Sequence, residues 1–413
     1  MKIVFLCHFS NSLIRNHLDL KEYAFTNLLL KLLCRSSIRY DDFAIWVSEY
    51  IREFENHKEY EFHIVAPHKG MKRKFQHFEI NGIKYHFFKS DCFFIKDVLK
   101  DKLHIQENND YRLNRNRIRR IIETIQPDIV LLCGAENPYY SLGVLDIKNI
   151  PIYVILQTLL NDSKRIKMGV GNTYRRRVEH DIFKHADFFC TYNDMAVDYI
   201  KKCNEYAQIL PVRFPTHYPQ VILPNKKVFD FVFFARIVTK NKGVEDLLHA
   251  TSIIAISNPN VKLNIIGNVS KEYKKTLDEI IKTKNITNNI HFSGYYQNIE
   301  ETYTNVVKAK ITVVPGITEA LNSTVRESMF MGQPTICYEA PSTLKINENK
   351  QCLFLAKMSN VDDLACKMLF ALENEEQIKQ IAQNGKEYAD REFSNKAIVD
   401  KLLENCKLIK DIY

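Results

Sequence analysis

Two glutamates stand out in the segment PGITEALNSTVRESMFMGQP, residues 315–334, where seven residues separate Glu319 from Glu327. The segment follows a strand-like run, KITVVPG, and then reads as the start of a helix. The first backbone N–H groups of a helix lack intrahelical partners and attract anions. Glu319 precedes this helix start and Glu327 lies inside the helix. The spacing therefore predicts two carboxylates beside an anion-binding helix terminus.

Glu327 also has a purely structural interpretation. The run TVRE, residues 324–327, fits a capping box, in which the glutamate accepts a hydrogen bond from the backbone N–H of the helix N-cap. From this segment alone, both interpretations of Glu327 stay open.

Two cations follow another predicted strand, in the run FFARIVTKNKG, residues 233–243. Arg236 closes the strand, and Lys242 precedes Gly243, which opens a helix. Across such a turn the two side chains can converge on one point. A guanidinium gives a bidentate contact and an ammonium a point charge, which together suit a diphosphate. The alternative is a pair of solvated surface cations.

Strand-like and helix-like segments alternate along nearly the whole chain, which is typical of βαβ units and mainly parallel sheets. The predicted strands cover residues 2–7, 61–67, 128–134, 151–158 and 187–192, and then 229–236, 261–267, 289–294, 310–316 and 334–340. In an open parallel sheet, ligands bind beyond the carboxyl ends of the strands. Both charged segments above follow such ends, so the elements place them where a ligand would bind.

The length of 413 residues favours two domains. A proline-rich stretch breaks both periodicities and predicts a linker over residues 211–226. We therefore expect a first α/β domain over 1–210 and a second over 227–392. The remaining residues, 393–413, predict a C-terminal helix that crosses back onto the first domain, with Ile398, Leu402, Leu403 and Ile409 as its apolar face.

Composition indicates a soluble globular protein, with 46% hydrophobic and 26% charged residues. No apolar run reaches the length of about 20 residues that a membrane span needs. The N-terminal run MKIVFLC reads as a buried first strand, because it lacks a full signal-peptide pattern. The ten cysteines are scattered without a CxxC pair, which is typical of a reduced cytoplasmic protein and argues against a zinc site.

The formal net charge is +9, and the excess is larger in the first half. Its basic clusters lie at 72–74, 112–120 and 175–177. Aromatic residues are not interleaved with them in an RNA-binding pattern, so we do not expect nucleic acid as a partner. The clusters are either solvated helix faces or contacts to anionic lipid or a phosphorylated acceptor.

Taken together, residues from about 229 to 345 resemble the donor-binding domain of retaining glycosyltransferases of family 4. Glu319 and Glu327 match the family's E-x7-E motif, Arg236 and Lys242 match its strand-end Arg and Lys-Gly, and MGQPTICYEA resembles its following turn and strand. The resemblance implies the GT-B architecture, which is an α/β fold of two facing Rossmann-like domains. It implies that Glu319 contacts hydroxyls of the transferred sugar and Glu327 the ribose. Arg236 and Lys242 would hold the diphosphate.

Further site residues follow from the predicted strand and helix ends together with this resemblance. The start of the helix would line the donor site, and Tyr295 would lie near the nucleotide base. In the first domain, Glu136 and Asn137 would face the acceptor. The complete set of expected substrate-binding residues is Glu327, Ala320, Leu321, Asn322, Ser323, Thr324, Tyr295, Gln157, Glu136, Asn137 and Asn11. Arg236, Lys242 and Glu319 are the expected catalytic residues.

The first domain departs from the family pattern in two places. The segment CHFSNSLIRN after the first strand contains no glycine, and Gln157 stands where many members carry a histidine. His8 lies nearby, but a single histidine at a strand end is more often a hydrogen-bonded structural residue.

The predicted activity is transfer of a sugar from a nucleotide diphosphate sugar to a hydroxyl, with retention. The resemblance implies front-face attack, with the leaving phosphate accepting the proton. A saccharide or lipid-linked saccharide is the expected acceptor, in bacterial surface polysaccharide assembly at the cytoplasmic face of the membrane. No metal or other cofactor is expected, because the chain has no Asp-x-Asp and two cations are present. The alternatives are a non-catalytic nucleotide- or sugar-binding protein and a sugar-nucleotide epimerase. A nicotinamide enzyme is not expected, since no G-x-G-x-x-G follows a strand.

Overall fold

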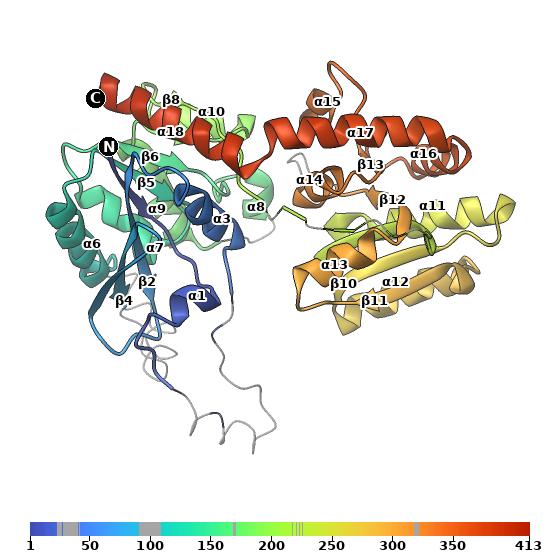
Figure 1. Cartoon of the computed structure of the whole chain (residues 1–413), viewed down its shortest axis with the longest axis horizontal. Coiled ribbons are helices and arrows are strands. Elements are labelled where there is room, and N and C mark those ends of the chain that lie inside the picture. The colour runs from blue at the N-terminus through green and yellow to red at the C-terminus, as the bar shows by residue number, and fades with distance from the viewer. Residues whose placement is uncertain are drawn as a thin grey trace. The chain divides into compact units, whose positions relative to one another are not determined.

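The chain divides into two compact units in a computed structural model (Figure 1). The structure describes residues 1–22, 27, 40, 42–90, 109–167, 171–216, 218–219, 221–222, 224, 226–317 and 322–413. The first unit comprises Met1–Pro215 and Asn395–Tyr413, and the second comprises Thr216–Ser394. Each unit is an α/β structure with its own sheet and cores.

The first unit contains an eight-stranded sheet in the order β3-β4-β2-β1-β5-β6-β7-β8. The strands are β1 (Lys2–Leu6), β2 (Glu61–His68), β3 (Phe75–Ile80), β4 (Ile83–Lys89), β5 (Ile129–Cys133), β6 (Ile152–Ile155), β7 (Phe188–Cys190) and β8 (Gln208–Ile209). All neighbours pair in parallel except β3 and β4. Strands β5 and β6 are buried along their whole length, which explains their continuous apolar runs.

Helices cover both faces of this sheet. They are α1 (Ser12–Arg15), α3 (Ile45–Phe54), α6 (Arg112–Ile125), α7 (Pro138–Ser141), α8 (Ser163–Lys167), α9 (Thr173–His185), α10 (Asp194–Cys203) and α18 (Asn395–Ile412), with a 3-10 turn η1 at Leu142–Asp146. Apolar side chains of α3 and α18 share one core with the sheet, and those of α6, α9 and α10 share the other.

The C-terminal helix α18 belongs to the first unit, as the sequence predicts. Ile398, Leu402, Leu403 and Ile409 are buried in its core. A polar contact supports this packing, because Asn405 Nδ2 donates to the Tyr153 hydroxyl at 3.0 Å.

The second unit contains a six-stranded parallel sheet in the order β11-β10-β9-β12-β13-β14. The strands are β9 (Phe229–Val238), β10 (Leu263–Val269), β11 (Ile290–Gly294), β12 (Ala309–Val314), β13 (Thr335–Tyr338) and β14 (Phe354–Ala356). The chain starts at β9, moves outward to β11 and returns to β12 on the other side of β9. The boundary between β9 and β12 is therefore the topological switch point, where such sheets bind ligands.

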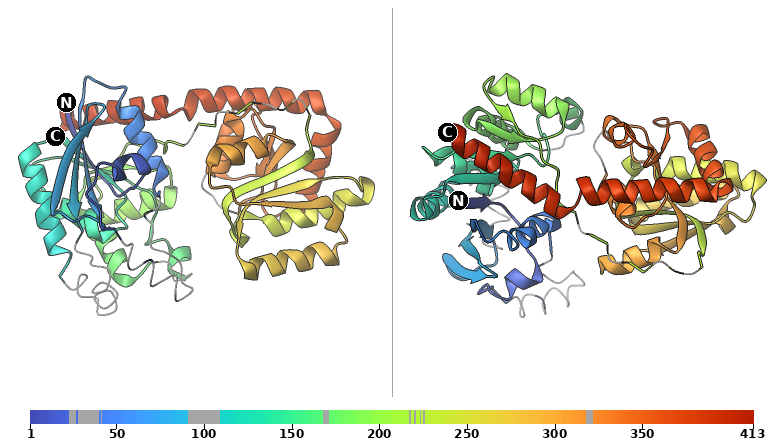
Figure 2. Two further views of the ribbon diagram at one scale, coloured as in Figure 1. Left: turned by 60° about the horizontal axis from the view of Figure 1, so that its bottom comes forward. Right: turned by 45° about the horizontal axis from the view of Figure 1, so that its top comes forward.

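Helices also lie on both faces of the second sheet (Figure 2). They are α11 (Val244–Ser257), α12 (Lys271–Thr283), α13 (Ile299–Val306), α14 (Ser323–Phe330), α15 (Pro341–Ile346), α16 (Val361–Glu373) and α17 (Glu375–Glu392), with 3-10 turns η2 (Lys240–Lys242) and η3 (Thr287–Asn289). Side chains of α11, α12 and α16 share the largest core with the sheet, whereas α13 and α14 contribute to two smaller cores.

The fold class predicted from the sequence is confirmed: two Rossmann-like α/β domains, with a C-terminal helix on the first. The antiparallel hairpin of β3 and β4 was not predicted. Of the expected linker, residues 211–215 group with the first unit and residue 216 begins the second. Every helix in the described ranges is too short or too polar to cross a membrane.

Candidate functional site

The two central strands of the second unit separate at the switch point. Pairing between β9 and β12 ends at Val232 and Thr312. Beyond these residues β9 continues beside β10 up to Val238, and β12 continues beside β13 up to Val314. The segments that follow the two strands, 239–243 and 315–322, therefore begin on either side of the place where the strands part. These are the segments in which the sequence predicts the donor site.

The two segments contact each other closely. The backbone N–H of Ile317 donates to the carbonyl oxygen of Asn241 at 3.0 Å. Gly243 has a φ of +73°, and a Cβ atom there would lie 1.8 Å from the carbonyl oxygen of Pro315. Only glycine permits both this conformation and this approach. Gly243 therefore allows the loop after β9 to pack against the loop after β12.

This packing brings together two of the predicted residues. Lys242, the last residue of η2, is partly buried. Burial lowers the pKa of the Lys242 ammonium, and the negative charge of Glu327 acts in the opposite direction. Glu327 lies on α14, after β12. A cation and a carboxylate from separate motifs thus lie within electrostatic reach of each other.

The start of α14 is incompatible with the capping-box interpretation of Glu327. Asn322 is the N-cap, and its side-chain oxygen accepts a hydrogen bond from the backbone N–H of Thr324 at 3.2 Å. In a capping box the glutamate lies three residues after the N-cap. That position is occupied by Val325, so Glu327 is not part of a capping box. Asn322, Ser323 and Thr324 form the helix start, as expected.

Arg236 is placed differently from the prediction. It lies inside β9, which runs on to Val238, and not at the strand's end. The strand has a bulge at this position: between the pairs Phe234 with Ile266 and Ile237 with Asn268, two residues of β9 oppose Gly267 alone. Arg236 is exposed, and in the described part of the chain it makes no hydrogen bond or ion pair.

Three predicted donor residues, Glu319, Ala320 and Leu321, lie outside the described residues. Tyr295 follows β11 and is 49% exposed, whereas the neighbouring Tyr296 packs against a core of the second unit. The strand ends thus leave Tyr295 accessible at the same edge of the sheet as Lys242.

The first unit repeats the separation of strands. Pairing of β1 with β5 ends at Leu6 and Leu132. The residue after β1, Cys7, donates its backbone N–H to the Val65 carbonyl of β2 at 3.1 Å, whereas Gly134 after β5 donates to the Ile155 carbonyl of β6 at 2.9 Å. This point is the switch point of the first sheet. His8 and the Glu136–Asn137 pair follow the two parting strands.

Glu136 is 5% exposed. Burial raises the pKa of its carboxyl group to about 7, Glu179 adds to this effect, and Arg175 opposes it. Asn137 Nδ2 donates to Glu136 Oε1 at 3.1 Å. The other oxygen, Oε2, is buried without a hydrogen-bond partner among the described residues.

Helix α9 supports both loops around this position, a role that the sequence did not reveal. Arg175 Nε donates to the carbonyl oxygen of Glu136 at 2.8 Å, and its Nη2 donates to Asn137 Oδ1 at 3.2 Å. One turn later, buried Glu179 accepts hydrogen bonds from the backbone N–H groups of Leu160 and Asn161 at 2.8 and 3.0 Å. The spacing of four residues between Arg175 and Glu179 was the available signal, because such residues share a helix face.

Two further predicted residues follow strands of the first unit. Gln157 comes after β6 and is exposed. Asn11 caps α1, because its Oδ1 accepts from the Ile14 N–H at 2.9 Å and its Nδ2 donates to Ser48 Oγ at 3.0 Å. These contacts give the Asn11 side chain a structural role in addition to the predicted one.

Several arginines of the basic clusters are paired inside the first unit. Arg115 forms two hydrogen bonds to Asp146, with a distance of 2.8 Å from Nε to Oδ2. Arg177 Nη2 lies 2.6 Å from Asp110 Oδ1. These cations are therefore not simply solvated, and their charge is partly neutralised within the fold.

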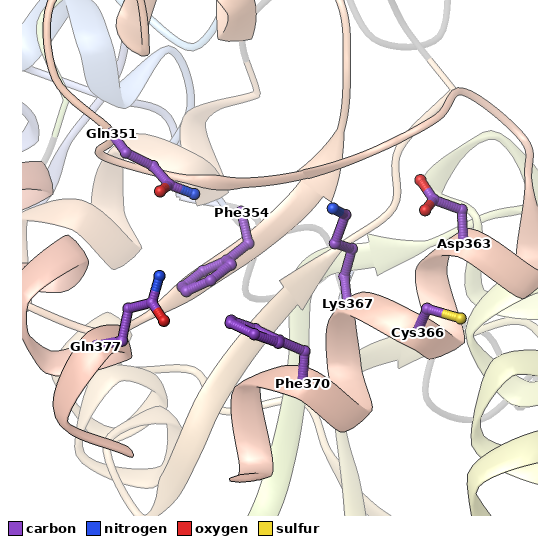
Figure 3. A pocket seen from close by; sticks show the side chains of 7 residues that line it. All are labelled: Gln351, Phe354, Asp363, Cys366, Lys367, Phe370 and Gln377. Carbon is purple, nitrogen blue, oxygen red and sulfur yellow. The ribbon is translucent and has the colours of Figure 1, made fainter. Parts of the chain in front are cut away.

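No group of three His, Cys, Asp or Glu side chains in the described ranges could hold a metal ion. A cavity of about 350 Å³ lies beside the edge strand β14, away from the central strands of the second sheet (Figure 3). Phe354, Phe370 and Lys367 are among its lining residues. Neither Lys242 nor Glu327 lines this cavity.

Known proteins resemble this chain in sequence and in fold. Residues 216–388 match the model of the family described as glycosyl transferases group 1. An uncharacterized glycosyltransferase of Methanocaldococcus jannaschii is 27% identical over 289 residues, which cover 68% of this chain and 75% of that protein.

Two solved structures share the fold at low identity. Sucrose-phosphate synthase from Thermosynechococcus elongatus has a TM-score of 0.69 and 12% identity, and the match covers 100% of both chains. Anabaena HepE in complex with UDP has a TM-score of 0.64 and 13% identity, over 99% of this chain and 100% of that chain. The fold is that of the GT-B architecture, as expected.

Proposed function

Since residues 216–388 belong to the glycosyl transferases group 1 and the chain has the GT-B fold, the protein is a glycosyltransferase, and we propose that it transfers the sugar of a nucleotide diphosphate sugar to a hydroxyl acceptor with retention. The observation that carries the proposal is the packing of the loop after β9 against the loop after β12, with Lys242 within electrostatic reach of Glu327. Solved structures of Anabaena HepE contain UDP or UDP-glucose, which supports a nucleotide diphosphate sugar as donor.

The second unit would bind the donor. Lys242 and exposed Arg236 supply positive charge, and α14 begins after the carboxyl end of β12, where its first N–H groups would attract an anion. Negative charge grows on the diphosphate as its bond to the sugar breaks. Cations that are already in position stabilise this charge and lower the activation barrier for transfer, because they need little reorganisation during the reaction. We assign them the part that a divalent metal would otherwise take, and propose a metal-independent reaction without other cofactors.

The two glutamates would bind hydroxyl groups. A carboxylate accepts hydrogen bonds from two hydroxyls at once, as on the ribose of a nucleotide. The structure removes the capping-box alternative for Glu327, which supports this role. Glu319 would bind the transferred sugar, and Tyr295 would lie near the base. In the proposed step the acceptor oxygen attacks the anomeric carbon on the face that the diphosphate leaves, and the departing phosphate takes the acceptor's proton.

The first unit would bind the acceptor through Glu136, Asn137 and Gln157. This assignment is supported by the position of the three residues after β5 and β6, in loops that Arg175 and Glu179 hold in place. We propose a saccharide or lipid-linked saccharide as acceptor, in bacterial surface polysaccharide synthesis. The enzyme would work in the cytoplasm, with peripheral contact to an anionic membrane.

The test is product analysis with UDP-, GDP- and ADP-sugars and a panel of p-nitrophenyl glycosides as acceptors. Transfer with an α-linkage from an α-linked donor, in the presence of EDTA, is expected. Sugar epimerisation without acceptor would show an epimerase. Tight nucleotide binding without release of free nucleotide would show a non-catalytic binding protein, and loss of transfer with EDTA would contradict metal independence.

A further inference from the structure

His8 occupies the switch point of the first unit and has a role that the proposed function leaves open. It is the second residue after β1 and comes just beyond Leu6 and Leu132, the last pair of β1 with β5. The carboxyl ends of both strands are thus beside it. A side chain at this place can reach a ligand bound at the edge of the first sheet.

The imidazole ring of His8 is held in one orientation. Its Nδ1 atom is hydrogen-bonded to the hydroxyl of Tyr139, on α7 after β5. The rings of Phe43 and Tyr139 pack edge-on against it, with centroid distances of 4.4 and 4.9 Å. The hydrogen bond ties one nitrogen, and the aromatic contacts oppose rotation of the ring. The opposite nitrogen, Nε2, therefore has a defined position.

His8 is also held in its neutral form. Burial lowers the pKa of the imidazole to about 3, and the positive charge of Lys69 acts in the same direction. A neutral imidazole carries one N–H and one acceptor nitrogen. A phenol is the better hydrogen-bond donor of the pair, so the Tyr139 hydroxyl donates to Nδ1. The proton of the ring then lies on Nε2.

The Nε2–H group is available to a ligand. His8 is partly exposed, and within the ranges that the structure describes Nε2 makes no hydrogen bond. We propose that His8 donates this hydrogen bond to the oxygen of the acceptor hydroxyl and that Tyr139 is the residue that positions it. The proposal rests on the proposed function, because it assigns the acceptor to the first unit. Since a neutral imidazole with this proton arrangement is a donor, His8 orients the attacking oxygen and does not remove its proton.

Three variants separate these roles. His8→Phe keeps a ring and removes the donor, so kcat/KM for the acceptor should fall about 3- to 10-fold, the range for one neutral hydrogen bond. His8→Gln restores an N–H at a similar distance from the backbone and should recover part of the loss. Tyr139→Phe keeps the packing but frees the ring, so its loss should be smaller than that of His8→Phe. The probes are UDP-glucose and p-nitrophenyl glucoside, or the pair with the fastest transfer in the panel above.

The same unit offers a matched control pair. His180 Nδ1 lies 3.2 Å from the hydroxyl of Tyr199, between α9 and α10 and away from the switch point. The variants His180→Gln and Tyr199→Phe should transfer sugar at the wild-type rate. Melting temperatures of all variants show whether a loss of transfer comes from unfolding.

Two measurements distinguish failure of this inference from failure of the proposed function. UDP binding by calorimetry should equal that of the wild type in every His8 and Tyr139 variant. A wild-type enzyme that binds no nucleotide or transfers no sugar would contradict the proposed function. With transfer established, an unchanged His8→Phe variant, or an increase in KM for the donor instead of the acceptor, would overturn the role of His8.

The proton arrangement has its own test, which does not need an acceptor. In ¹⁵N-histidine NMR, the signal that is absent from His8→Gln should show a neutral ring with the proton on Nε2 from pH 5 to 9. The ratio of wild-type to His8→Phe kcat/KM should likewise stay constant from pH 6 to 9. A proton on Nδ1, or a titration near pH 6.5, would overturn the assignment.

Discussion

The ammonium group of Lys242 and the carboxylate of Glu327 interact electrostatically across the switch point of the second sheet, although one follows β9 and the other lies on α14. Without a bound ligand, the carboxylate offsets part of the cost of burying the ammonium. A diphosphate would add negative charge at the same place and stabilise the charged form of the partly buried lysine.

Nucleotide diphosphates should therefore stabilise the protein more than the corresponding monophosphates. At a free UDP concentration of about 100 times the dissociation constant, the free energy of unfolding should rise by about 2.7 kcal/mol. Thermal-shift measurements with UDP, GDP, ADP and the monophosphates test this expectation.

Lys242→Met should weaken UDP binding about 10- to 100-fold, the range for a hydrogen bond to a charged group. Lys240→Met is the matched control, because Lys240 lies in the same 3-10 turn with an 83% exposed side chain. Equal stabilisation by UMP and UDP, or equal losses in the two variants, would remove Lys242 from the diphosphate site.

Substitutions of Asn322 and Glu327 should have separate effects, the first mainly on stability and the second mainly on nucleotide binding. Asn322→Ala removes the N-cap of α14 and should lower the free energy of unfolding by about 1 kcal/mol. Glu327→Gln should leave the helix cap intact and weaken nucleotide binding by about 1.5 to 3 kcal/mol. Calorimetry and thermal denaturation of both variants measure the two effects. A lower melting temperature with normal nucleotide binding in the Glu327→Gln variant would show that Glu327 has a structural role instead.

Glu136 should make stability depend on pH. Its folded-state pKa of about 7 lies above the ordinary value of 4.5, so the folded protein keeps a proton that the unfolded chain loses between these values. The free energy of unfolding should therefore fall as pH rises from about 4.5 to 7, by at most about 3 kcal/mol. Glu136→Gln stays neutral and lacks this contribution. The melting temperature of the wild type relative to the variant should fall from pH 5 to pH 8, and a constant difference would contradict the buried carboxyl.

The basic clusters of the first unit predict salt-sensitive binding to anionic membranes. Each basic residue near an anionic leaflet contributes about 1 kcal/mol, and screening limits the reach to about 8 Å at physiological ionic strength. Co-sedimentation with phosphatidylserine vesicles at low and high salt is the measurement. Internal pairs such as Arg115 with Asp146 reduce the number of available charges. Absence from the pellet at low salt, or equal binding to neutral vesicles, would argue for a purely structural role of the clusters.

The sequence by itself determined the alternation of strands and helices, because buried strands and amphipathic helices leave local periodic patterns. It also placed Lys242 and Glu327 in segments that follow strands, because a strand and the segment after it are consecutive in the sequence. The hairpin of β3 and β4 was missed because an edge hairpin has a less continuous apolar pattern than a central strand.

Only the tertiary structure shows which of the predicted segments lie next to each other. The partner of a parallel strand lies far away along the chain, so no local pattern shows that β9 and β12 part after Val232 and Thr312. The same holds for Arg175, which the sequence shows only as part of a basic cluster, and for Glu179: in the structure they hold the loops after β5 and β6. The bulge at Arg236, the cap at Asn322 and the contact of His8 with Tyr139 likewise depend on backbone register and long-range packing, which spacing along one chain does not specify.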